Sequence, residues 1–116
     1  MKRVSICAPL GGDVAQNIQR AKRYMEFALR SGVAPMVPHF YALCLNDDVT
    51  AERELGMAAG RAMLFCCDEL WVFGETVTPG MRLEIQFCKS LNIPVRYIQE
   101  SEIVKKIGGV IHEQSV

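Results

Sequence analysis

The run Leu70-Trp71-Val72-Phe73, closed by Gly74, is apolar throughout and only four residues long. It is too short for a helix and rich in residues that favour strands, so it predicts a strand that is buried on both faces. Strands of that kind belong to parallel sheets covered by helices on both sides. The run therefore predicts an α/β protein built on a parallel sheet.

The segments on either side of this run alternate between strand and helix patterns. Further strands are expected at residues 4–8, 34–37 and 93–98, and helices at residues 14–30, 50–66, 79–91 and 102–107. Asp13 and Thr50 are expected to cap the first two helices. The alternation predicts a single-domain, doubly wound (Rossmann-like) short parallel sheet flanked by helices over residues 1–107, with a C-terminal tail at residues 108–116.

The composition narrows the classes of partner. The chain has 116 residues, of which 50% are hydrophobic, and its 13 basic residues balance its 13 acidic ones. That length fits one core, and a net charge of zero gives no electrostatic footprint for a nucleic acid polymer or an anionic membrane. Neither a signal peptide nor an apolar run of about 20 residues is present, so a cytoplasmic protein acting on small molecules is expected.

The cysteine pattern predicts reduced thiols. Five cysteines are scattered along the chain with no C-x-x-C pair, and only two histidines accompany them. An odd, unpatterned set favours neither disulfides nor zinc. We therefore expect no metal site and no cofactor.

Ligands of doubly wound sheets bind beyond the carboxyl ends of the strands, so the loops at residues 8–13, 38–49 and 74–81 form the candidate site. The second loop shows no sustained period and is interpreted as a long functional loop. Within the three loops and the helix start that follows, the candidate substrate-binding residues are Ala8, Pro9, Gly11, Gly12, Asp13, His39, Gly74, Thr78, Gly80 and Met81.

The first loop has two open interpretations. Gly11 and Gly12 precede a helix N-terminus, whose exposed N–H groups can cradle a phosphate. The same glycines can instead form a simple turn that Asp13 caps. His39 also has two interpretations, as a site residue or as a local hydrogen-bonding residue.

Glu84 is the candidate catalytic residue. Along the third predicted helix, at about 100° per residue, it falls inside an apolar arc. A carboxylate there is costly unless it lies at a cleft or has partners, and functional sites tolerate such costs. The alternative is that its side chain only emerges near the helix start and favours the dipole.

Several stretches resemble the nucleoside 2-deoxyribosyltransferase-like superfamily, and most closely its small bacterial and phage members. They are SICAP at residues 5–9 with Gly12, Asp13 and Asn17, DELWVFG at residues 68–74, GMRLEI at residues 80–85, and KSLNIPV at residues 89–95. The resemblance covers roughly residues 2–98. In the well-studied relatives, the glutamate that matches Glu84 attacks C1′ of the sugar, expels the base and forms a glycosyl-enzyme ester.

The resemblance thus implies an enzyme of N-glycosidic bonds, a deoxyribosyltransferase or an N-glycosidase, acting on a nucleoside or nucleotide. The chain departs from the family pattern. Ser5 or Ile6 replaces a tyrosine, and Gly60 stands where an aspartate manages the proton on the leaving base. Thr78 keeps a hydroxyl where the relatives carry aspartate or serine.

Further departures are Ala8, Leu10 and Gly11, where the smaller members favour serine, tyrosine and arginine. Two outcomes follow from the absence of the aspartate that the relatives carry at the position of Gly60. Another carboxylate, Asp13, Asp47 or Glu75, replaces it, or catalysis has decayed and a non-catalytic nucleotide-like ligand-binding or sequestering protein remains.

A homodimer or higher homo-oligomer is also expected. The second and third predicted helices carry more apolar side chains than one thin sheet face can bury, among them Met57, Met63, Phe65, Leu83 and Phe87. Gly56 and Gly60 permit close backbone approach. Their face is predicted to meet either a partner chain or the chain's own sheet.

Overall fold

The strand β3 (Glu69–Phe73) lies at the centre of a four-stranded, all-parallel sheet. The sheet order is β2-β1-β3-β4, with β1 (Arg3–Cys7), β2 (Ala34–Met36) and β4 (Val95–Ile98). Leu70, Trp71, Val72 and Phe73 are all buried. The predicted doubly wound α/β fold is confirmed.

The protein is described by a computed structural model over residues 1–109. Of the tail predicted at residues 108–116, all but its first two glycines lies outside the described residues. Within the described residues, no helix is long and apolar enough to cross a membrane.

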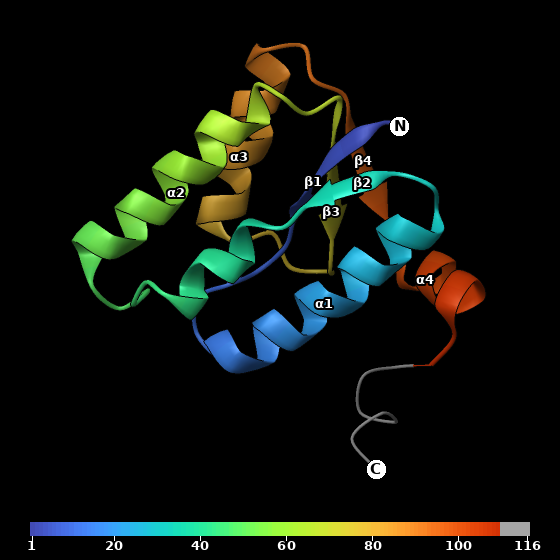
Figure 1. The fold of residues 1–116 in the computed structure, drawn as a ribbon, viewed down its shortest axis with the longest axis horizontal. Helices are drawn as coiled ribbons and strands as arrows, with labels where there is room; N and C mark the ends of the chain where they lie inside the picture. The colour runs from blue at the N-terminus through green and yellow to red at the C-terminus, as the bar shows by residue number, and fades with distance from the viewer. Residues whose placement is uncertain (110–116) are drawn as a thin grey trace.

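Helices cover both faces of the sheet (Figure 1). α1 (Val14–Arg30) and α4 (Glu100–Ile107) lie on one face, whereas α2 (Thr50–Leu64) and α3 (Pro79–Ser90) lie on the other. The 3-10 helix η1 (Pro38–Leu43) links β2 to the loop before α2. The connection from β1 to β2 and the connection from β2 to β3 therefore pass over opposite faces.

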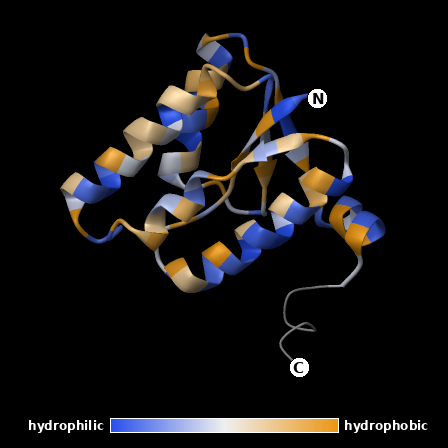
Figure 2. Cartoon of the chain, in the orientation of Figure 1, coloured by the Kyte–Doolittle hydropathy of each residue, from blue (hydrophilic) through white to orange (hydrophobic). Residues whose placement is uncertain are grey.

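The core consists of two hydrophobic clusters, one on each face. On the α1 side, Tyr24 stacks on Phe73 with ring centroids 4.5 Å apart. On the α2 and α3 side, Leu64, Met81 and Ile85 pack against the strands. The alternation of blue and orange along α1 in Figure 2 is the colouring of a helix with one buried stripe. Burial of both sheet faces is the main stabilising term of the fold.

Two local predictions are wrong. Residues 38–43 are not an irregular loop, because Pro38 begins a 3-10 helix in which Phe40 N donates to Val37 O and Cys44 N donates to Tyr41 O. Such a short helix leaves no periodic signal. Thr50 does not cap α2, since Val49 holds the cap position without a side-chain hydrogen bond.

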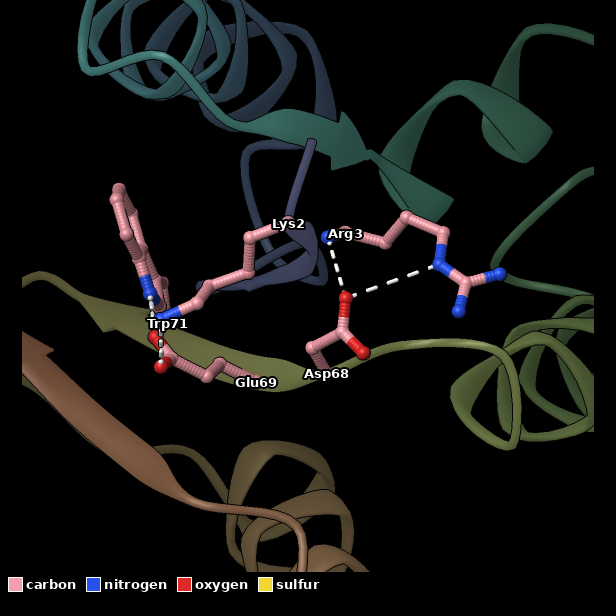
Figure 3. A network of polar contacts seen from close by, with 5 residues as sticks. All are labelled: Lys2, Arg3, Asp68, Glu69 and Trp71. Atoms are coloured by element: carbon pink, nitrogen blue, oxygen red, sulfur yellow. Dashed lines mark hydrogen bonds and ion pairs between the residues drawn. The ribbon is translucent and has the colours of Figure 1, made fainter.

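Polar side chains join β1 to β3 at the amino ends of the strands (Figure 3). The Asp68 carboxylate accepts a hydrogen bond of 2.8 Å from Arg3 N, and the Lys2 ammonium lies 2.6 Å from Glu69 Oε2. Glu69 Oε1 also accepts a 2.8 Å hydrogen bond from the Trp71 indole. These contacts tie the two strands together at one end and leave their carboxyl ends free for a site.

The left-handed backbone conformation of Asn92, which follows α3, can be tested by substitution. Its φ of 59° is left-handed, a conformation that costs most residues roughly 1–2 kcal/mol but that asparagine and glycine tolerate. Asn92→Ala is expected to lower the free energy of unfolding by about 1 kcal/mol, whereas Asn92→Gly is expected not to lower it. Chemical denaturation measures both, and an alanine variant as stable as the wild type would contradict the assignment.

Candidate active site

A pocket of about 560 Å³ opens at the carboxyl ends of β1 and β3. Its walls come from the loop after β1, from η1 and the loop that follows it, from α2, and from the first turns of α3. The connections from β1 and β3 diverge at this edge, which is where doubly wound sheets bind ligands. The volume is in the range of small-molecule sites.

Close packing between α2 and η1 forms one wall. A side chain at Gly60 would begin 3.4 Å from Pro38 Cβ, and one at Gly56 would begin 3.4 Å from the end of the Leu45 side chain. The glycine face of α2 therefore meets neither a partner chain nor the sheet, the two possibilities considered above. It packs against η1 and the adjoining loop of the same chain.

Local capping places Glu84 at the pocket. Thr78 Oγ1 accepts a hydrogen bond of 3.2 Å from Met81 N, and Pro79 occupies the first helical position, so α3 begins at the mouth of the pocket. Glu84 lies about one turn further along α3 and lines the pocket. It also lines a smaller adjoining cavity of about 40 Å³ between α2 and α3.

The Glu84 carboxyl is poorly satisfied. Its Oε1 is buried and has no hydrogen-bond partner among residues 1–109. Burial raises the pKa of Glu84 to about 7, although the Cys7 thiol and the Arg61 guanidinium act in the opposite direction. The carboxyl therefore exchanges a proton near neutral pH, which is the range required of a group that acts in acid, base or nucleophilic chemistry.

Two thiols adjoin this carboxyl. Cys7, which lines the pocket from the end of β1, has its pKa raised far above the ordinary value by burial and then by the charge of Glu84. Burial also raises the pKa of Cys88 to about 11. Both thiols are therefore protonated at neutral pH and are unsuited to nucleophilic or metal-binding roles.

His39 lies in the wall of the pocket. Its side chain is 4% exposed, and Nε2 lies 2.9 Å from Ala8 O, to which it donates a hydrogen bond. Burial lowers the pKa of His39, so the ring is neutral at neutral pH. This bond is the one that the local hydrogen-bonding interpretation predicts, and it joins η1 to the end of β1. His39 also lines the pocket, and its buried Nδ1 has no partner among residues 1–109, so both interpretations stay open.

The structure brings together most of the predicted site. The lining includes Ala8, Gly11, His39, Thr78, Gly80, Met81 and Glu84. Pro9, Gly12, Asp13 and Gly74 are not part of it. Asp13 instead caps α1, with Oδ1 accepting a hydrogen bond of 3.1 Å from Gln16 N, whereas Gly12 and Gly74 take up positive φ angles of 86° and 89° in turns.

Sequence reasoning missed three polar residues of the lining: Tyr41, Glu52 and Arg53. Tyr41 comes from η1, whose helical form was not foreseen. Glu52 and Arg53 lie one turn before Gly56 and Met57 on α2, so the i, i+4 spacing to the glycine face was the available signal. Among residues 1–109, no group of three or more histidine, cysteine, aspartate or glutamate side chains is placed to hold a metal ion.

The fold and the pocket define a doubly wound parallel α/β domain with a ligand-sized pocket at the carboxyl edge of its sheet. A family model described as a domain of unknown function (DUF7768) matches residues 2–98, and the chain belongs to this family. No curated protein matches the chain.

The buried carboxyl predicts a pH-dependent stability. The pKa of Glu84 rises from 4.5 to about 7 on folding, so ionisation between these values destabilises the folded state, and stability falls as pH rises through that window. Glu84→Gln is expected to raise the free energy of unfolding by about 2 kcal/mol above pH 7 and to leave it nearly unchanged at pH 4.

Urea denaturation at pH 4 and pH 8 measures the difference. Glu75→Gln is the matched control, because Glu75 is exposed in the loop after β3. A Glu84→Gln variant no more stable than the wild type at pH 8 would show that the carboxyl is well solvated.

Proposed function

We propose that this protein acts on the N-glycosidic bond of a nucleoside or nucleotide, as a deoxyribosyltransferase or an N-glycosidase, with Glu84 as the nucleophile. One observation carries the proposal. The carboxyl of Glu84 lines a ligand-sized pocket, and its buried Oε1 has no partner among the described residues. An oxygen atom left unsatisfied at that depth has no protein partner to give up when a ligand binds, once the side chain turns it toward the pocket.

The chemistry proceeds in two displacements. The base first takes a proton from solvent at a ring nitrogen. The ionised carboxylate then attacks C1′ as the bond from C1′ to the base nitrogen breaks, and the base leaves as a neutral molecule with the bonding electrons. In the second step, water or another base attacks C1′ and releases the carboxylate. The largely apolar walls strengthen the interaction between the carboxylate and the positive charge that develops on the sugar.

One of the carboxylates considered above as a replacement for the aspartate of the relatives lies in the pocket. Of the three carboxylates considered, Asp47 lines it, whereas Asp13 and Glu75 do not. An ionised Asp47 would stabilise positive charge on a protonated leaving base. It is the second catalytic group of the proposal.

A non-catalytic binder is the second candidate. It is favoured by Gly60, which packs against Pro38 and carries no acidic side chain where the relatives have one. Such a protein would hold a nucleotide-like ligand in the same pocket without turnover.

Base release decides between the two candidates. Glu84→Gln is expected to reduce the release of free base from a panel of nucleosides and monophosphates by about a thousandfold or more while leaving binding nearly intact, because an amide cannot form the ester. Wild-type kcat/KM is expected to rise with pH and to level off above about 7, as the nucleophile ionises.

Chromatography of the free base provides the measurement, and Glu75→Gln again serves as the control. No release by the wild type across the panel would remove the enzymatic proposal. Calorimetric binding with the ligand recovered unchanged would then favour the binder.

We further propose that the protein is a homo-oligomer. The outer surface of α2 and α3 exposes large apolar side chains, namely Leu55, Met57, Met63, Phe65 and Leu83. Phe65 is 66% exposed and makes an edge-to-face contact with Phe87 across the two helices. Because Phe65 and Phe87 form an apolar contact at the surface, and exposed apolar clusters mark interaction sites, a second copy is the proposed occupant at this position.

Light scattering at micromolar concentration tests this assembly. The wild type is expected to have at least the mass of a dimer, and Phe65→Glu is expected to shift the mass toward the monomer because a charge enters an apolar contact. Leu29→Glu, at an exposed position on α1, is the matched control. A wild-type monomer would contradict the proposal.

A further inference from the structure

The charged side chains that line the pocket are mostly acidic. Within the described chain, the lining holds the carboxyl groups of Asp47, Glu52 and Glu84 and one guanidinium, that of Arg53. His39 adds no charge at neutral pH, because burial lowers its pKa. An anionic ligand would therefore enter against a predominantly negative lining.

Two helices that begin at the pocket, α1 and α3, each have an N-terminal donor engaged by a capping side chain, whereas α2 follows Val49, which makes no side-chain cap. The Asp13 carboxylate caps α1 through Gln16 N. Thr78 Oγ1 takes the corresponding donor of α3, Met81 N, and Pro79 has no N–H to offer. One donor at each of these two helix starts is thus engaged within the protein and is not available to a phosphate.

Asp47 also lies over the glycine turn. Its Oδ2 is 3.4 Å from the point where a side chain at Gly11 would begin. The turn that carries it is held by hydrogen bonds, since Asp48 N donates to Asn46 Oδ1 at 2.9 Å and Asn46 N donates to Glu52 Oε1 at 3.0 Å. A fixed carboxylate therefore stands beside the loop that the sequence offered as an anion site.

Arg61 lines the adjoining cavity and acts on Glu84, whereas within residues 1–109 the one basic side chain that lines the pocket itself is Arg53. It is exposed and forms no ion pair with any residue from 1 to 109. A single exposed guanidinium is well screened by water and salt, whereas the carboxylates next to the glycine turn and α2 act at short range.

We infer that the pocket takes nucleosides without a phosphate group and rejects their 5′-monophosphates, with Asp47 as the specificity-determining residue. The inference rests on the proposed function and narrows it to uncharged substrates. Repulsion between like charges in a partly enclosed site disfavours the dianionic phosphate, while an uncharged sugar can donate its hydroxyl groups to the same carboxylate.

Calorimetry with the four common 2′-deoxynucleosides and their 5′-monophosphates tests the inference. The nucleoside that binds is expected to bind at least about tenfold more tightly than its monophosphate at low ionic strength. Raising the salt from about 10 mM to about 300 mM is expected to narrow this ratio, because salt screens repulsion and would not relieve a steric clash.

The Asp47→Asn variant measures how much the charge of Asp47 contributes to this discrimination. It is expected to improve monophosphate affinity about three- to tenfold with a smaller effect on the nucleoside. Asp48→Asn is the matched control, since Asp48 is exposed and outside the lining.

Three outcomes overturn the inference in distinguishable ways. A monophosphate that binds as tightly as its nucleoside overturns it and leaves the proposed function standing. A ratio that neither Asp47→Asn nor salt changes overturns the role of Asp47. No binding by any of the eight compounds overturns the proposed function together with the inference.

Discussion

The pairing of β1 with β3 is the contact on which the other parts depend. Both strands are buried on two faces, with Val4 to Cys7 and Leu70 to Phe73 almost wholly removed from solvent. Such strands require helices on both sides. The connections that supply those helices diverge at the carboxyl ends of β1 and β3, and the pocket occupies the gap that this divergence leaves.

Stabilised and destabilised carboxyl groups lie at opposite ends of this strand pair. At the amino ends, Asp68 and Glu69 are each supplied with donors, and interactions with Arg3 and Lys2 hold their pKa values below the ordinary range. At the carboxyl ends, Glu84 is half-buried, with a raised pKa and an oxygen that has no partner among residues 1–109. Carboxyl groups are thus stabilised where they support the sheet and left without a partner at the pocket.

The sequence predicted the strands and the long helices because their signals are local: an apolar run, a 3.6-residue period, an N-cap and a terminating glycine. It also predicted that Glu84 is out of place in its apolar arc. Tyr41, Glu52 and Arg53 were missed because their place in the lining depends on contacts between distant segments. Pro38 meets Gly60, and His39 reaches Ala8 O, across 22 and 31 residues of chain respectively. The interpretation of Gly11 and Gly12 as an anion site likewise did not include Asp47, because only folding brings Asp47 next to that turn.

The attachment of α2 has a consequence for how the site can vary. Only Gly60 and Leu64 of this helix are buried, and its close contacts are with η1 rather than with the strands. The residues that shape this side of the pocket are therefore a different set from those that hold the sheet together. Tyr41, Arg53 and Met57 lie outside the buried core, so substitutions there can reshape the pocket at little cost in folding stability.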